Sequence, residues 1–273
     1  MSSWLARTVR RLLHLTPPTR TSSTTVASPP PVPPRPELTY DHAAGTVSLV
    51  HEFYGPLRLF ADDSAISQHL LDGRCVWESY LVDKFAEYFV PGRNIIDAGA
   101  NLGLHSIALA KLAKQGELVF AFEPHPEILP LTLANCARFP NIRCFPKAAS
   151  DSAATFHMPS IRGALNQAGT HLHAAAEPGM FAVESVTIDS LELPNIGLIK
   201  VDVEGHEMEC LQGAMHTIRR DRPVLFVEIE GGQDVDSAPP PVAQVIRARI
   251  QTICDLGYNV ARLHVHDYLF TPR

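Results

Sequence analysis

The sequence has no excess of positive charge, because its 29 acidic residues outnumber 23 lysines and arginines and leave a net charge of −6. Nucleic-acid-binding domains are usually basic, so this balance argues against RNA or DNA as a partner. Cysteine is also scarce: there are five among 273 residues, and no two form a C-x-x-C pair. We therefore expect free thiols in a reducing, cytoplasmic compartment, and no metal site built on cysteine.

Residues 1–37 lack the apolar content that a folded core requires. Within them, residues 4–15 place leucines and a valine on one face of a helix and three arginines on the other. This pattern is typical of peripheral contact with an anionic membrane, of an organelle transit peptide, or of a disordered tail, and it is too short and too charged to span a bilayer. Residues 16–36 are rich in proline and predict a stiff linker. The folded domain is expected over residues 38–273.

The central motif, residues 94–106 (NIIDAGANLGLHS), lacks the glycine pattern G-x-G-x-x-G. It predicts a buried strand ending at Asp97, a turn with Gly99 and Gly103, and then a helix, an arrangement that commonly holds an adenosine-containing cofactor. Asn101 stands where a pyrophosphate site needs its middle glycine. Asp97 repels phosphate and suits a cationic ligand such as S-adenosylmethionine, which carries a sulfonium and an ammonium. The alternative is a tight turn without a ligand.

A second apolar strand over residues 117–123 ends in Glu123, twenty residues after Gly103. An acid at the end of the second strand commonly accepts hydrogen bonds from ribose hydroxyls. The alternative is a solvated glutamate.

The segments DAGANLGLHS, VFAFEP, IKVDVEGHEMECLQGA and VLFVEIE, in this order, resemble the FkbM family of S-adenosylmethionine-dependent methyltransferases over about residues 70–270. The resemblance implies an α/β, Rossmann-like class I methyltransferase with a seven-stranded, mostly parallel sheet and helices on both faces. It also implies methylation of a hydroxyl oxygen. His105 and Ser106 occupy positions where the family often has an aromatic and a hydroxyl residue, and His206 stands where the family has a small residue or a histidine. By resemblance, Ser150 or Asp151 contacts the adenine edge; the alternative for Asp151 is a turn residue.

The strand over residues 197–203 places Asp202, Glu204 and His206 at the same edge of the sheet as Asp97 and Glu123. Histidine titrates near neutrality, so we expect His206 to act as general base or to position the acceptor, oriented by Glu204 or Asp202. His105 is the second candidate. The alternative is that these acids only pair with Lys200, because charges in a buried strand need partners.

No metal is predicted, for two reasons. The D-x-E-x-H spacing offers oxygen and nitrogen ligands, but Gly205 breaks the geometry that places alternate residues on one face. His171 and His173 lie in an irregular segment, residues 152–182, that is expected to cover the substrate side; without a nearby acid or cysteine they are interpreted as solvated.

Three further elements are expected: a β-hairpin over residues 46–60, a helix over 78–90, and, after a turn at residues 204–206, one helix that buries Met208, Leu211, Met215 and Ile218. Glu78 is interpreted mainly as a charge favourable to the helix start, and the alternative is that it faces the pocket. Glu228 and Glu230, at the end of the next strand, are expected to line the acceptor pocket.

The predicted function is S-adenosylmethionine-dependent O-methylation of a sugar, lipid or secondary metabolite, so the partner is a small-molecule or glycan acceptor. A nicotinamide-dependent oxidoreductase is the enzymatic alternative, but it requires the missing glycine pattern. A cofactor-binding adaptor without catalysis, acting through the proline-rich arm, is the non-enzymatic alternative. The sequence predicts no oligomeric state.

Overall fold

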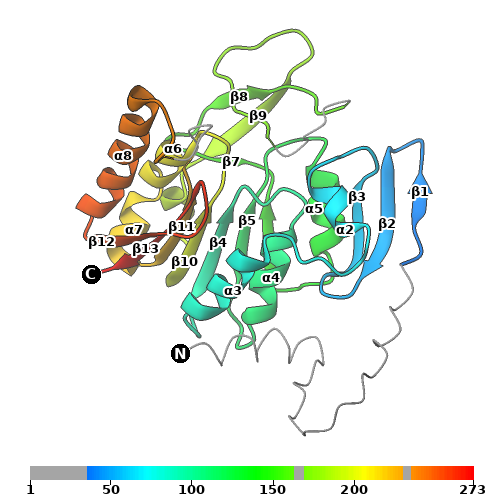
Figure 1. Cartoon of the computed structure of the whole chain (residues 1–273), viewed down its shortest axis with the longest axis horizontal. Helices are drawn as coiled ribbons and strands as arrows, with labels where there is room; N and C mark the ends of the chain where they lie inside the picture. The colour runs from blue at the N-terminus through cyan, green and yellow to red at the C-terminus, as the bar shows by residue number, and fades with distance from the viewer. Residues whose placement is uncertain (1–35, 163–168, 230–234) are drawn as a thin grey trace, which may run out of the picture.

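The computed structural model describes residues 36–162, 169–229 and 235–273. Their main element is a seven-stranded sheet in the order β12-β13-β11-β10-β4-β5-β6 (Figure 1). Its strands are β4 (Asn94–Ala98), β5 (Val119–Phe122), β6 (Ile142–Phe145), β10 (Ile196–Val201), β11 (Val224–Glu228), β12 (Tyr258–Arg262) and β13 (Asp267–Pro272). Strands β6, β5, β4, β10 and β11 are parallel, whereas β13 runs antiparallel to both β11 and β12. The predicted α/β fold with a mostly parallel seven-stranded sheet is therefore confirmed.

The central strands β4, β5, β10 and β11 are mainly apolar and buried because both faces of the sheet are covered by helices. Ile95 belongs to one apolar cluster, together with α3 (Ser79–Tyr88), α4 (Leu104–Leu112) and α5 (Leu129–Cys136). Its neighbour Ile96 belongs to the other cluster. Helices α6 (Glu207–Gln212), α7 (Met215–Asp221) and α8 (Pro240–Asp255) cover that second face. Consecutive strand residues point to opposite faces, so the central strands contribute to both clusters.

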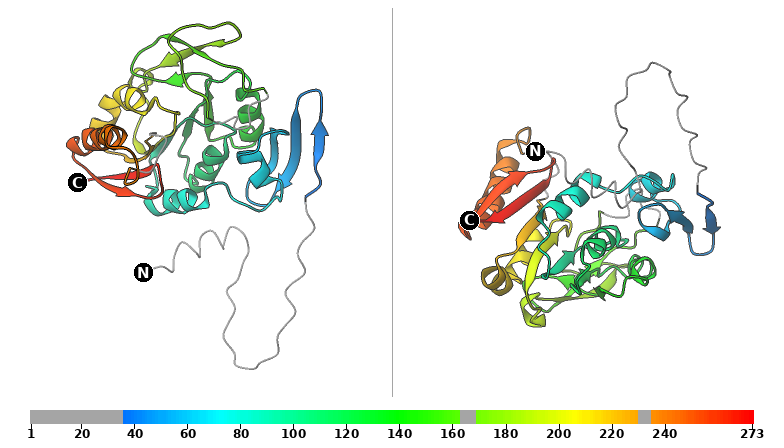
Figure 2. Two further views of the ribbon diagram at one scale, coloured as in Figure 1. Left: turned by 45° about the horizontal axis from the view of Figure 1, so that its top comes forward. Right: turned by 90° about the horizontal axis from the view of Figure 1, so that it is seen from below.

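The N-terminal part of the described chain forms a separate antiparallel sheet of β1 (Thr39–Asp41), β2 (Thr46–His51) and β3 (Gly55–Phe60), followed by the short helix α2 (Ile66–Leu70). The predicted hairpin is thus confirmed. Asn135 of α5 joins this sheet to the domain: its Oδ1 accepts from the Arg58 amide at 2.7 Å, and its Nδ2 donates to the Arg58 and Leu102 carbonyls. The two sheets lie side by side in both views of Figure 2.

The segment expected to be irregular, residues 152–182, contains regular structure. Strand β8 (Thr155–Met158) pairs antiparallel with β9 (Phe181–Val186), and β9 also pairs with the two-residue strand β7 (Ala148–Ala149). A single bridge joins His157 to His173. The expectation was wrong for these residues because β8 alternates too briefly to be recognised without its partner strand. Residues 163–168 lie outside the described part.

The single helix expected after β10 is divided into α6 and α7 at Gly213. A Cβ atom at this position would lie 1.8 Å from the Ser150 carbonyl oxygen, so only glycine permits the approach. The Gly213 carbonyl also accepts the Asp189 amide at 2.9 Å, next to the 3₁₀ helix η1 (Asp189–Leu191). Packing against another backbone segment therefore interrupts a helix whose apolar periodicity is continuous.

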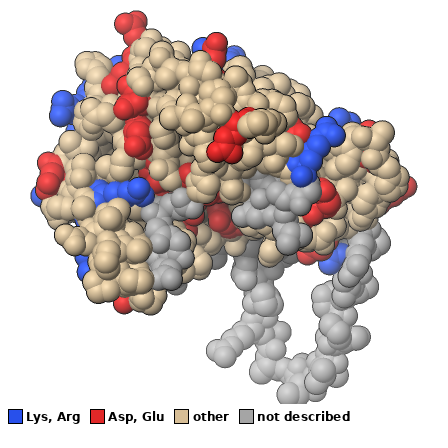
Figure 3. Space-filling model, turned by 90° about the horizontal axis from the view of Figure 1, so that it is seen from above, with Lys and Arg blue, Asp and Glu red and all other residues tan. Residues whose placement is uncertain are grey.

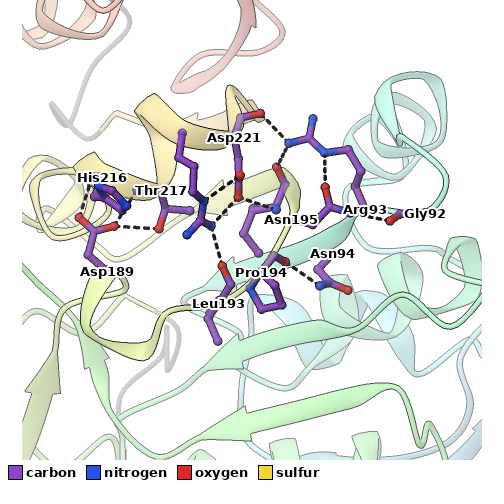
Figure 4. A network of polar contacts seen from close by, with 12 residues as sticks. Gly92, Arg93, Asn94, Asp189, Leu193, Pro194, Asn195, His216, Thr217 and Asp221 are labelled. Carbon is purple, nitrogen blue, oxygen red and sulfur yellow. Dashed lines mark hydrogen bonds and ion pairs between the residues drawn. The ribbon is translucent and has the colours of Figure 1, made fainter.

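A polar network joins segments around the beginning of β4 and β10 (Figure 4). Arg93 donates to the carbonyls of Ile196 and Asp221, each at 2.5 Å, and to Asn195 Oδ1. Asp221 also accepts from the Ile196 amide and pairs with Arg220. These contacts hold the end of the sheet that lies away from the candidate site. No helix of the described residues is long and apolar enough to cross a membrane.

Candidate active site at the carboxyl ends of the central strands

A cavity of about 260 Å³ opens at the carboxyl ends of β4, β5, β10 and β11. This is where open α/β sheets bind ligands, and the volume lies near the lower end of the ~300–1,000 Å³ typical of small-molecule sites. Its polar lining comprises Glu78, Asn101, His105, Glu123, Thr170, Lys200, Asp202, Glu204 and Glu228. Its apolar lining includes Ala65, Ile66, Trp77, Leu102, Leu104, Ile128, Met158 and Leu172.

The turn after β4 forms one wall through Gly99 and Asn101. Gly99 has φ +82°, and a Cβ atom there would lie 1.7 Å from the Asp202 carbonyl oxygen. Only glycine therefore lets β4 and β10 end so close together. Gly103, with φ +81°, packs against Cys136 instead, where a Cβ atom would lie 2.6 Å from the sulfur. Thus Gly99 and Asn101 face the cavity, whereas Gly103 shapes the turn from behind.

Glu123 lies at the end of β5 and faces the same cavity. Its Oε2 accepts from the Asn101 amide and its Oε1 from the His125 amide, each at 2.8 Å. Burial raises the pKa of this carboxyl to about 7, although both hydrogen bonds act in the opposite direction. Each oxygen keeps a further lone pair, so the fixed carboxylate can accept bonds from ligand hydroxyls.

Lys200, on β10, is the centre of a buried ion cluster. Its ammonium lies 3.2 Å from Asp97 Oδ1 and 3.1 Å from Asp202 Oδ2, and it donates to the Gly99 carbonyl at 2.8 Å. Burial opposes the charge, but the Asp202 and Asp97 carboxylates together raise the pKa of Lys200. Asp97 is fully buried, accepts a bond from Ser106, and is not part of the cavity lining. Asp97 and Asp202 therefore have the partner that charges in a buried strand require.

Two further carboxyl groups face the cavity beside this cluster. Burial and the neighbouring Asp202 raise the pKa of Glu228 to about 10, so Glu228 keeps its proton and shares a hydrogen bond with Asp202. Burial, and then the charges of Asp202 and Asp267, raise the pKa of Glu78 to about 7. The expectation that Glu228 faces the pocket agrees with this geometry, whereas Glu230 lies outside the described residues.

His105 completes this side of the cavity. Its Nε2 lies 3.3 Å from Glu78 Oε2, yet it makes no hydrogen bond. Burial, and then Lys200, lower the pKa of His105 to about 4, so the ring is neutral near pH 7.

The remaining predicted site residues lie apart from the cavity lining. His206 Nε2 lies 2.8 Å from Ser150 Oγ, and its ring packs edge-on to Phe156. Ser150 is fully buried and also contacts Asp151. The chain turns at Glu204 and Gly205, with φ 50° and 89°, so Glu204 faces the cavity while His206 points toward Ser150.

Trp77 was not expected at the site, and a position of Glu78 facing the pocket was only the alternative to a helix-start charge; both residues line the cavity. Glu78 precedes α3 with φ 42°, a conformation that no local pattern in the sequence announces. Both residues reach the cavity because α3 packs against α4. Among the described residues, no group of three His, Cys, Asp or Glu side chains is arranged to hold a metal ion.

With this geometry established, comparison with known proteins identifies the family. The sequence pattern of the methyltransferase FkbM domain matches residues 97–260, well over half of the chain. The chain belongs to the FkbM methyltransferase family. The resemblance noted from its motifs is therefore confirmed.

Among relatives of this FkbM protein, the hexuronic acid methyltransferase AglP of Haloferax volcanii is 30% identical over 145 residues. That match covers 50% of this chain and 56% of AglP, so it spans little more than half of the relative. The crystal structure of methyltransferase FkbM from Methylobacillus flagellatus has 16% identity and a TM-score of 0.45, covering 71% of this chain and 56% of the other. Aeropyrum pernix fibrillarin with bound S-adenosyl-L-methionine has 12% identity and a TM-score of 0.45, covering 83% and 93%.

Proposed function

We propose that this protein transfers the methyl group of S-adenosylmethionine to a hydroxyl oxygen of a sugar, free or in a glycan. The family assignment supports the methyl donor and the reaction class. The observation that carries the proposal is the convergence of Gly99, Asn101 and Glu123 on one cavity at the carboxyl ends of β4 and β5. The sugar acceptor is supported by the name of the relative AglP, a hexuronic acid methyltransferase.

The residues present fit this donor. Glu123 is held by two backbone amides and offers free lone pairs to vicinal hydroxyls such as those of a ribose. Gly99 lets the turn after β4 lie directly against the Asp202 backbone, so that both line one cavity. When bound, S-adenosylmethionine supplies an electrophilic methyl carbon on a positively charged sulfur. The carboxylates around the cavity suit such a charge.

The proposed role of the chain in catalysis is to hold the acceptor oxygen and to accept its proton. Of the residues expected to do this, Asp202 and Glu204 line the cavity, and we assign to them the positioning of acceptor hydroxyls. His206 as general base stays a prediction, but its bond to Ser150 favours another group. Glu78 faces the cavity with a pKa of about 7, which suits a base that works near neutrality.

Two measurements test this function. Calorimetric titration should show binding of S-adenosylmethionine and none of NADH, which would separate a methyltransferase from an oxidoreductase. Transfer of a radiolabelled methyl group to sugars should then separate an enzyme from an adaptor that only binds the cofactor. Tight cofactor binding without transfer to any sugar would overturn the assigned acceptor class.

Cytoplasmic location and peripheral membrane contact remain proposals. The membrane contact was assigned to residues 4–15, which lie outside the described part of the chain. Cosedimentation of the full chain with vesicles of anionic lipid, compared with neutral vesicles, is its direct test. Equal recovery of the protein with both kinds of vesicle would contradict a basic amphipathic contact.

A further inference from the structure

The cavity has two ends that differ in charge. Glu123 marks one end, after β5, and Glu228 marks the other, at the end of β11. Strands β4 and β10 lie between them, so three strand spacings, ~14 Å, separate the two positions. The ribose of the methyl donor is assigned to Glu123, so the acceptor is assigned to the other end of the cavity, near β11. We call this end the acceptor side.

Acidic groups dominate the acceptor side. Glu78, Asp202, Glu204 and Glu228 all line it. Lys200 is the single lysine or arginine among the described lining residues, and its side chain is 4% exposed because Asp97 and Asp202 both hold it. Residues 163–168 and 230–234, which the structure does not describe, contain no lysine or arginine in sequence. Viewed from above, acidic and basic side chains are both scattered over the surface of the molecule (Figure 3).

The raised pKa values of Glu78 and Glu228 show that a further negative charge is unfavourable on this side. Burial is the main reason for the raised pKa values of Glu78 and Glu228, and the charge of Asp202 is the next in both cases. His105 offers no compensating cation, because its pKa is lowered to about 4. An added carboxylate on this side would meet the charge of Asp202, and the described lining offers no cation besides Lys200, which is already paired.

An independent observation shows that this side is prepared for a polar ligand. His105 is 5% exposed, lines the cavity, and its Nε2 is a buried polar atom without a hydrogen-bond partner. Such atoms are rare in folded proteins, because leaving one unpaired costs stability. The neutral imidazole is suited to exchange a hydrogen bond with a hydroxyl or an amine. Trp77 and Ile66 supply an apolar wall beside it.

We propose that the acceptor side of this cavity selects a sugar without a carboxylate, either neutral or carrying an amino group, and rejects uronic acids. This inference rests on the proposed sugar O-methylation and makes the acceptor different from the one named for AglP. Lys200 cannot serve as a carboxylate receptor, because its two partners already occupy it. Glu204 and Asp202 instead accept hydrogen bonds, which hydroxyl and ammonium groups donate and a carboxylate does not.

The test compares methyl glycosides of the gluco, galacto and manno series, each as the neutral sugar, the 2-amino sugar and the uronate. Initial rates are measured at saturating S-adenosylmethionine and pH 8. In a series that is methylated, the neutral or amino sugar should have a kcat/KM at least ~10-fold above that of the uronate, because like charges in a desolvated site repel strongly. A uronate used as well as its neutral counterpart would overturn the selectivity and leave the methyl transfer intact. No methylation of any sugar, with the cofactor bound, would instead overturn the proposed function.

Two variants distinguish acids that face the acceptor from acids that face the cofactor. Asp202→Asn and Glu204→Gln each remove one charge from the lining, and each should raise the uronate-to-neutral ratio of kcat/KM several-fold. Glu204→Gln keeps the test valid if Asp202→Asn fails to fold, because it removes no partner of Lys200. Glu184→Gln is the matched control, since Glu184 is an exposed acid of β9 that pairs with Lys147 outside the cavity; its ratio should stay unchanged. If both lining variants change only the KM for S-adenosylmethionine and leave the ratio constant, the acids serve the cofactor and the inference is wrong.

Discussion

The ion cluster around Lys200 makes a quantitative prediction about stability. In Lys200→Met, Asp97 would remain fully buried with its cation removed, while the apolar stem of the side chain is largely retained. Removing one partner of a buried ion pair lowers the free energy of unfolding by about 3–5 kcal/mol, mainly because the other charge stays buried without compensation. For a domain of this size each 1 kcal/mol lowers the melting temperature by about 2–4 °C, so the expected decrease is about 6–20 °C.

Thermal and urea unfolding, followed by circular dichroism, would measure this effect. The double variant Lys200→Met/Asp97→Asn should recover part of the loss, because it removes the stranded charge as well. Lys147→Met is the control: its partner Glu184 is exposed, so the unfolding midpoint should not change measurably. A loss below about 1 kcal/mol in the single variant, or a double variant no more stable than the single one, would refute the assignment of Lys200 as the structural counterion.

Further predictions concern the cofactor turn and the proton acceptor. Gly99→Arg should abolish binding of S-adenosylmethionine in calorimetry, because any side chain at this position would collide with the Asp202 carbonyl and distort the turn. Normal affinity would show that the cofactor does not bind at this turn. Glu123→Ala should weaken cofactor binding by about 1–3 kcal/mol through loss of charged hydrogen bonds, and wild-type affinity would exclude the ribose role. In the wild type, kcat should fall as the pH drops below about 7, since protonated Glu78 cannot accept a proton; a pH profile of Glu78→Gln that keeps this acidic limb would assign it to another group. His206→Ala should keep kcat within a few-fold of wild type if a cavity-facing carboxylate is the base, and a large loss confined to kcat would restore the role predicted for this histidine.

The sheet edge that carries the site was predictable from sequence because each acid is marked by a local pattern, an apolar strand next to it. Asp97, Glu123 and Asp202 each follow an apolar strand, and parallel strands place their carboxyl ends at one edge. The structure places Glu123 and Asp202 at the cavity and Asp97 directly beneath, through Lys200. Pairing of Asp202 with Lys200 was also considered from sequence, as an alternative to a functional role. The structure combines the two, since Asp202 both pairs with Lys200 and lines the cavity.

The direction of His206 and the interrupted helix were not predictable in this way. Both depend on contacts across the chain: His206 is turned toward Ser150 by positive φ angles at Glu204 and Gly205, and Gly213 interrupts the helix by meeting the Ser150 backbone. Ser150 lies more than fifty residues earlier, so no window of sequence contains these interactions. The role of Trp77 was missed, and that of Glu78 was only the alternative, for the same reason, since both depend on how α3 and the first hairpin pack against the domain.

The attachment of the N-terminal sheet through Asn135 has a practical consequence for the design of N-terminal truncations. The region of family similarity begins at residue 97, but Ala65, Ile66, Trp77 and Glu78 all contribute to the cavity. A fragment cut at the similarity boundary would begin inside β4, a central strand of the sheet, and would also lose one wall of the cavity. Its catalytic failure would then reflect the cut strand and the missing wall, and would say nothing about whether the intact chain is an enzyme.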